Sequence, residues 1–200
     1  MSVEIPWTRI RSLTVRPRIF GGEQAGAFGV DLRTPRPGDR WAADLATANL
    51  RRDTDTLLLI SALTEALSID GRIELRQPGI KRPLYGYAVE VDGAGQAGSV
   101  LKVRGVRRSA PVTPGQQFSI VHKGVHHVYQ VAGTRQILAG ADGKMTFPIW
   151  PMLRGLTVDG SRVALDDPMI EGKVLGFAEK GVTSVLNRTE PVSFTIEERR

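Results

Sequence analysis

The three histidines, His122, His126 and His127, are the side chains best suited to bind a metal ion, because imidazole is a common zinc ligand. His122 and His126 lie four positions apart, and Lys123-Gly124 between them predicts a hairpin turn. On one strand such residues lie roughly 13 Å apart at about 3.3 Å per residue, too far to share an ion, whereas a turn could bring them nearer. No carboxylate lies close in sequence to complete a site. We therefore expect structural or surface histidines and no bound metal.

An acidic group is the second candidate for chemistry, as a cation site or an acid–base pair. It consists of Asp159, Asp166, Asp167 and Glu171. Consecutive residues of an extended segment point to opposite sides, so Asp166 and Asp167 cannot easily present two carboxylates to one atom. Asp167-Pro168 instead predicts a turn. We expect no catalytic residue in this group.

The glycine-rich segment 93–98 matches the GxGxxG pattern of phosphate-binding loops. That loop works only between a strand and a helix whose N-terminus holds the phosphate. Here the next segment, Val100-Leu-Lys-Val103, is typical of a strand, so we interpret the glycines as a tight connection between two domains. The GxSxG, GxxxxGK(S/T) and HExxH motifs do not occur. We expect no enzyme and no cofactor.

Composition describes an ordinary globular protein, with 41% hydrophobic and 24% charged residues among 200. Cysteine is absent, which excludes a disulfide or cysteine–metal framework. The net charge is +6, but the basic doublets are far apart and lack interleaved aromatic residues, so we expect no specific nucleic-acid binding. These doublets are Arg51-Arg52, Lys81-Arg82, Arg107-Arg108 and Arg199-Arg200.

Two membrane-directed features are missing from the sequence. No apolar stretch approaches the roughly 20 residues that a membrane span needs. The segment 1–7 lacks the basic and apolar regions of a secretory signal. We expect synthesis in the cytoplasm and no membrane partner.

Alternating apolar and polar residues predict strands in both end regions of the chain. The expected strands are 10–16 (ended by Pro17), 28–32, 41–50, 73–75, 85–91, 172–177 and 192–196, with 21–26 as a loop and 35–38, 78–79 and 81–83 as turns. One helix is expected over about 53–68, because Asp53 or Thr54 can cap it and Leu59, Leu63 and Ala66 have helical spacing.

The middle of the chain reads as a compact all-β unit. Short strands around 100–103, 118–121, 125–131 and 145–150 alternate with glycine-containing turns. We therefore predict a mainly β protein in which 1–88 plus 168–200 form one β-domain with the helix, and 89–167 form an inserted module. About five strands in this length predict a small barrel of the OB or SH3-like kind, with a sandwich as the alternative.

Three tryptophans, Trp7, Trp41 and Trp150, are expected to be core or interface anchors, as is Tyr129. Trp150 lies between Pro148 and Pro151, which predicts a short strand at a sheet edge. In an oligomer, a neighbouring subunit can cover such an edge.

The order of motifs along the chain resembles a known family. The motifs are Val15-Arg-Pro-Arg-Ile-Phe20, Gly38-Asp-Arg-Trp41, the helix leading to Gly71-Arg72, Pro114-Gly-Gln-Gln-Phe-Ser-Ile120, His126-His-Val-Tyr129, Asp142-Gly through Ile149-Trp-Pro-Met-Leu-Arg154, Gly160 through Pro168, and the strand 192–197. In this order they are similar to distal tail proteins, minor tail proteins of long-tailed bacteriophages and prophages.

The resemblance implies a virion structural protein of the phage tail. It implies a tail-tube-like β-sandwich with one flanking helix that forms a homohexameric ring, with the inserted β-module outside it. The ring would join the tail tube to the hub of the baseplate or tail tip. Its partners would be the tail tube protein and the hub protein, with the tape-measure protein as a further candidate.

Two other functions stay open at this point. The inserted module could bind carbohydrate or a host-surface polymer, with Trp150, Tyr129 and His126 as a shallow platform. The protein could also be another tail component, such as a tube terminator or a hub subunit. A cell-wall hydrolase is disfavoured, because the chain lacks a paired acid–base or metal set.

Overall fold

The structure is a computed structural model, and it describes residues 2–25, 29, 31–34, 38–77, 88–185 and 188–199. The protein is mainly β, with 43% strand and 10% helix. Its described strands form two six-stranded sheets and three two-stranded ones, accompanied by two helices. The mainly β class expected from the sequence is therefore confirmed.

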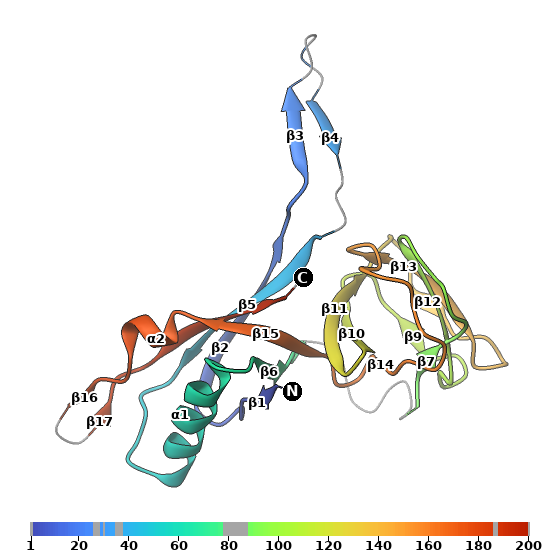
Figure 1. The fold of residues 1–200 in the computed structure, drawn as a ribbon. Coiled ribbons are helices and arrows are strands. Elements are labelled where there is room, and N and C mark those ends of the chain that lie inside the picture. The colour runs from blue at the N-terminus through green and yellow to red at the C-terminus, as the bar shows by residue number, and fades with distance from the viewer. Residues whose placement is uncertain are drawn as a thin grey trace.

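The first large sheet, called here the N/C sheet, takes its strands from both end regions of the chain. In spatial order these are β1 (Val3–Glu4), β6 (Gly71–Glu74), β15 (Met169–Leu175), β18 (Ser193–Glu198), β5 (Arg40–Thr47) and β2 (Ile10–Arg18). All neighbours are antiparallel except β1 and β6. Strands far apart in the sequence therefore lie side by side (Figure 1).

The second large sheet, called the middle sheet, lies within residues 90–164. In spatial order its strands are β14 (Val163–Ala164), β10 (Gln117–His122), β11 (Val125–Val131), β13 (Met145–Trp150), β8 (Val100–Arg104) and β7 (Glu90–Val91). The two terminal strands of this sheet, β14 and β7, are also connected to each other. Glu90 and Arg162 form a bridge, and the Val163 N–H donates to the Val89 carbonyl at 2.8 Å.

Smaller elements flank these sheets. Two-stranded pairs are β3 (Gly22–Ala25) with β4 (Asp31–Thr34), β9 (Pro111–Val112) with β12 (Ile137–Leu138), and β16 (Ser184–Val185) with β17 (Arg188–Thr189). The hairpin β3–β4 projects away from both large sheets (Figure 1). The second helix, α2 (Phe177–Lys180), is a single short turn.

Helix α1 (Thr54–Ala66) is the helix expected over about 53–68. Asp53 caps it, because its carboxylate accepts from the Thr56 N–H at 2.9 Å. Leu59, Leu63 and Ala66 are buried at helical spacing and join the core of the N/C sheet. The cap and the apolar stripe read from the sequence are both confirmed.

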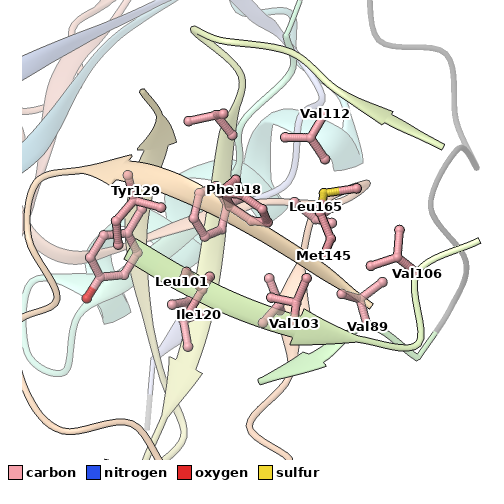
Figure 2. Packing of buried hydrophobic residues seen from close by; sticks show 14 of the residues in the cluster. Val89, Leu101, Val103, Val106, Val112, Phe118, Ile120, Tyr129, Met145 and Leu165 are labelled. Atoms are coloured by element: carbon pink, nitrogen blue, oxygen red, sulfur yellow. The ribbon is translucent and has the colours of Figure 1, made fainter. Parts of the chain in front are cut away.

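The protein has two hydrophobic cores. One consists only of residues within 89–165 and is centred on Phe118, which is stacked on Tyr129 and meets Phe147 edge-on. In Figure 2 the Tyr129 ring joins this core while its hydroxyl oxygen points away from the other labelled side chains. The other core combines both end regions and receives a single buried residue from the middle sheet, Val128.

Several expected elements need correction. The strand starting at Ile10 does not end at Pro17 but continues to Arg18, because β2 is an edge strand and can place a proline on its free side. The segment 22–25, expected as a loop, is strand β3. The expected strand 28–32 lies only partly within the described residues, whose Asp31–Thr34 form β4. The expectations for 35–37 and 78–87 lie outside the described residues.

The strand that holds Trp150 is not at a sheet edge, as expected, but lies between β11 and β8. β13 pairs with β8 through Met145–Pro148 and with β11 only at Ile149 and Trp150. The Pro148 carbonyl accepts from Ala132, just beyond the end of β11. Pro148 is therefore tolerated inside the sheet, because it lies at the end of the β13–β11 ladder, where its carbonyl is bonded and no donor is needed from its nitrogen.

Gly172 in β15 has no room for a side chain, so Gly172→Ala is expected to cost about 3 kcal/mol of unfolding free energy. A β-carbon there would lie 1.9 Å from the Glu197 carbonyl oxygen, which belongs to the neighbouring strand and cannot rotate away. Urea unfolding measures the difference. Gly155→Ala is the control, because a β-carbon meets nothing within 4 Å there. Equal costs for the two variants would contradict this close approach.

Candidate functional site

The two large sheets meet at a junction built from Trp41, Val128, Trp150, Arg154 and Glu198. Trp41 and Glu198 come from β5 and β18 of the N/C sheet, and Val128 and Trp150 come from β11 and β13 of the middle sheet. Arg154 follows β13 in a loop. These residues decide how the middle sheet is held against the N/C sheet.

Glu198 is the polar centre of this junction, and only 1% of it is exposed. Its two carboxylate oxygens accept from the Trp41 and Val128 backbone N–H groups, each at 2.7 Å. The Arg154 guanidinium also donates to it and forms an ion pair. Burial raises the pKa of Glu198, while Arg154 and the two N–H groups act in the opposite direction. One carboxylate thus connects three separate elements.

The aromatic residues expected to be anchors are buried or partly buried against other residues of the same chain. Trp41 is buried and meets Trp150 edge-on, with ring centroids 5.0 Å apart and planes at 89°. Tyr129 is buried in the middle-sheet core, and its hydroxyl accepts from the Arg154 N–H at 3.3 Å. Trp7 packs on the N/C core, and its indole N–H donates to the Glu74 carbonyl at 2.9 Å. Trp41 and Trp150 therefore pack the two sheets together.

The three residues suggested as a carbohydrate platform do not form one exposed face. Tyr129 is 3% exposed, and Trp150 is partly buried against Trp41. His126 and Tyr129 are three positions apart on β11, so their side chains point to opposite faces of the strand. The His126 ring instead contacts Ser119 at 3.1 Å. A stacking surface for a sugar needs exposed aromatic faces, which this trio does not provide.

The hairpin expected at Lys123-Gly124 joins β10 to β11, with Val121 opposite His126. Lys123 and Gly124 both have positive φ, 50° and 80°, as a two-residue hairpin turn requires. The turn brings the rings of His122 and His127, not of His126, to within 6.5 Å of each other. Within the described part of the chain, no three histidine, aspartate or glutamate residues are grouped to hold a metal ion.

The acidic group around residue 166 is divided among separate partners. Asp167 pairs with Arg162, Asp159 pairs with Arg104 at 2.7 Å, and Glu171 accepts from the His126 N–H at 2.8 Å. These bonds hold the three carboxylates at different elements. The group therefore does not converge on one point where an ion or a substrate could lie.

The glycine-rich segment 93–98 joins β7 to β8, which are neighbouring antiparallel strands of one sheet. It does not connect two domains, as we expected from its composition. Gly93, Gly95 and Gly98 all have positive φ, which explains the glycines. Because a strand follows the segment, it also lacks the helix N-terminus that phosphate binding requires.

Strand β2 has a free edge nine residues long. Among the strands that the structure describes, β2 pairs only with β5. Its polar side chains lie on an open, charged face of the sheet, where Arg16 pairs with Asp44 at 2.6 Å and Arg18 with Glu197 at 3.4 Å. Such a free edge can accept a strand from another chain.

Sequence reasoning missed the two charged members of the junction, Arg154 and Glu198. A signal for Glu198 was present, since Val192, Phe194 and Ile196 alternate and period two continues to residue 198. An acid on the buried face of a strand requires partners. Nothing local to Arg154 indicates that it is the cation involved, because it reaches Glu198 across 44 residues.

A search with protein-family models finds none that matches the chain, and a search of curated proteins finds no match. None of the described helices is long and apolar enough to cross a membrane. The fold and the site therefore define a mainly β protein whose two sheets are joined by a buried ion pair and an aromatic contact.

His127, beside the junction, makes stability depend on pH. Burial, and secondarily the Arg154 charge, lowers the pKa of His127 from 6.5 to about 4. Between these values the unfolded chain binds a proton that the folded chain does not, so unfolding free energy falls as pH decreases from 6.5 to 4. At about 1.4 kcal/mol per pH unit the loss from His127 is roughly 3 kcal/mol.

Urea unfolding of the wild type and His127→Gln at pH 7 and pH 4 measures this loss. The wild type should lose roughly 3 kcal/mol more than the variant. The comparison cancels the contribution of Glu198, whose raised pKa favours the folded state at low pH. Equal losses in the two proteins would show that His127 titrates normally in the folded state.

Proposed function

We propose that the protein is a structural component of a bacteriophage tail, and that six copies form a ring at the distal end that joins the tail tube to the tip or baseplate hub. In this proposal the N/C sheet with helix α1 is the tail-tube-like β-sandwich domain. The middle sheet is a small barrel inserted into it. The protein performs no reaction, and its place of action is the virion.

The free edge of β2 is the observation that carries this proposal. A nine-residue edge strand exposes backbone N–H and C=O groups that readily pair with another chain. Next to it, the hairpin β3–β4 extends away from the body of the protein (Figure 1). A projecting hairpin and an open strand edge on one subunit are complementary features, and repeating their contact around an axis closes a ring.

The proposed barrel has its own support. The terminal strands of the middle sheet, β7 and β14, are connected by the Glu90–Arg162 bridge, and the Val91 N–H donates to the Ser161 carbonyl at 2.9 Å. A sheet whose two ends bond to each other has few free edges. Such a module can lie outside a ring without recruiting further strands, in contrast to the N/C sheet.

The open face of the N/C sheet suits a solvated channel. Cross-strand pairs such as Arg16 with Asp44 keep this face polar, and Thr195 also donates to Asp44 at 2.7 Å. Mixed, mutually paired charges offer DNA no continuous positive surface. The proposal accordingly includes no specific nucleic-acid contact. Its partners are the tail tube protein and the hub protein, with the tape-measure protein as a further candidate.

Light scattering coupled to size-exclusion chromatography tests the ring. The wild-type protein is expected to elute at about six times its chain mass of 21.8 kDa, and electron microscopy of purified tails should place it at the distal end. Replacing residues 22–34 by an Asn-Gly turn should reduce the mass to that of one chain, with thermal unfolding unchanged. A monomeric wild-type protein that is also absent from purified tails would refute the proposal.

A further inference from the structure

A pocket of about 210 Å³ lies on the middle sheet beside the junction. Ile120 and Leu153 form its apolar part, and its polar part includes His122, His127 and Arg154. The Tyr129 ring, Thr157 and Ser161 also line it. Its volume is sufficient for a small molecule but not for a polymer segment of several units.

The described polar side chains that line this pocket include basic groups but no acidic ones. Three of its side chains are basic, His122, His127 and Arg154, and none of the described residues that line it is acidic. The charge of Arg154 is balanced by Glu198, which bonds to it at the junction. Protonation of His127 would add positive charge to the pocket.

The bonds of Arg154 also decide which histidine atom is available. An Arg154 terminal nitrogen lies 3.3 Å from His127 Nδ1, and guanidinium can only donate, so Nδ1 accepts. The proton of the neutral His127 ring is then on Nε2, which becomes a donor. The His127 Nε2, the His122 ring and the Ser161 hydroxyl have no hydrogen-bond partner among the described residues.

We propose that this pocket binds a compact anion, the carboxylate or phosphate group of a small molecule. The Arg154 guanidinium, the His127 Nε2 donor, a partly apolar wall and the lack of acidic residues among the described lining favour a negatively charged group over a neutral one. This site is separate from the ring contacts proposed above.

Binding of the anion should be coupled to uptake of a proton. The groups around His127 are His122 on β10, His126 on its own strand and Arg154 in the loop after β13, with Glu198 on β18 paired to Arg154. Burial and Arg154 keep the pKa of His127 near 4 in the empty pocket. A bound anion raises that pKa, so the affinity should fall about tenfold between pH 5 and pH 6.

Calorimetric titration with glucuronate and with inorganic phosphate tests this inference, with glucose as the neutral control. We expect saturable binding of at least one anion at pH 5 at millimolar concentrations, about tenfold weaker binding at pH 6, and no binding of glucose. The two anions distinguish a carboxylate site from a phosphate site. Lack of binding by both anions, or equal binding of glucose, would overturn the proposal.

Two histidine variants show whether the pocket is responsible. His127→Gln should weaken anion binding at pH 5 at least tenfold and remove its pH dependence. His126→Gln is the matched control, because His126 lies on the same strand but faces Ser119 on the other side. Ser161→Ala gives a second variant that leaves the junction intact. Unchanged binding in both His127→Gln and Ser161→Ala would place the anion elsewhere and refute the assignment.

Discussion

Glu198→Ala is expected to lower the free energy of unfolding by about 3–5 kcal/mol, because it breaks a buried ion pair. The substitution leaves the Arg154 guanidinium without its carboxylate in a site that is largely removed from water. It also leaves the Trp41 and Val128 N–H groups without an acceptor. Each unpaired buried donor costs about 1–3 kcal/mol, and this cost adds to that of the unpaired guanidinium.

Urea unfolding followed by circular dichroism measures this effect. Glu197→Ala is the matched control, since Glu197 is the neighbouring residue on the opposite face of β18 and its pairs with Arg18 and Arg40 are long, at 3.4 and 3.8 Å. It should cost at most about 1 kcal/mol. Combining Glu198→Leu with Arg154→Met should restore part of the stability, because it removes the unpaired charge but leaves the Trp41 and Val128 N–H groups without an acceptor. A Glu198→Ala cost no greater than that of Glu197→Ala would show that the junction does not depend on this carboxylate.

Trp41→Ala should cost about 3–5 kcal/mol, because it removes one of the two tryptophan side chains that pack the two sheets together. Trp41 is 4% exposed and its ring meets Trp150 edge-on at 5.0 Å. The cavity would lie between β5 and β13, where neither backbone can move inward without breaking its ladder. Tryptophan fluorescence during urea unfolding measures the loss.

Trp7→Ala is the control for this prediction, because Trp7 is only partly buried and lies away from the junction. We expect about 1–2 kcal/mol for it. A double-variant cycle of Trp41→Ala with Trp150→Ala should give a coupling of about 1 kcal/mol, as for other edge-on aromatic pairs. Additive costs would mean that the two rings are neighbours without a direct interaction.

Local patterns predicted the elements whose conformation depends on nearby residues. The alternation over 41–50 and 192–196 corresponds to β5 and β18, and Asp53 caps helix α1 as expected. The turn at Lys123-Gly124 was predictable because glycine adopts positive φ at little cost. In these cases the side-chain period or the turn residue is sufficient by itself.

The incorrect expectations concern sheet neighbours, which local patterns do not contain. Prolines around Trp150 predicted an edge strand, yet β13 is internal because its two halves pair with different strands. The segment 22–25 reads as a loop by its glycine, yet it pairs with Asp31–Thr34 to form a hairpin. In both cases a partner strand determined the outcome.

The junction was only partly predictable for the same reason. The presence of tryptophans indicated that some of them would be packing anchors. Which two rings meet depends on how β5 and β13 pack. Glu198 could have been recognised by its place in the alternation, whereas its three donors lie 157, 70 and 44 residues away. Contacts over such separations are a property of the whole fold.

The position of β18 between β15 and β5 has a consequence for how the chain folds during synthesis. β18 is translated after every other described strand, and until it emerges the N/C sheet remains in two halves, β1-β6-β15 and β5-β2. The middle sheet uses only residues within 90–164 and can assemble earlier on the ribosome. The middle sheet can therefore form first in the nascent protein, and the segment that completes the N/C sheet also supplies Glu198, which bonds to Val128 and Arg154.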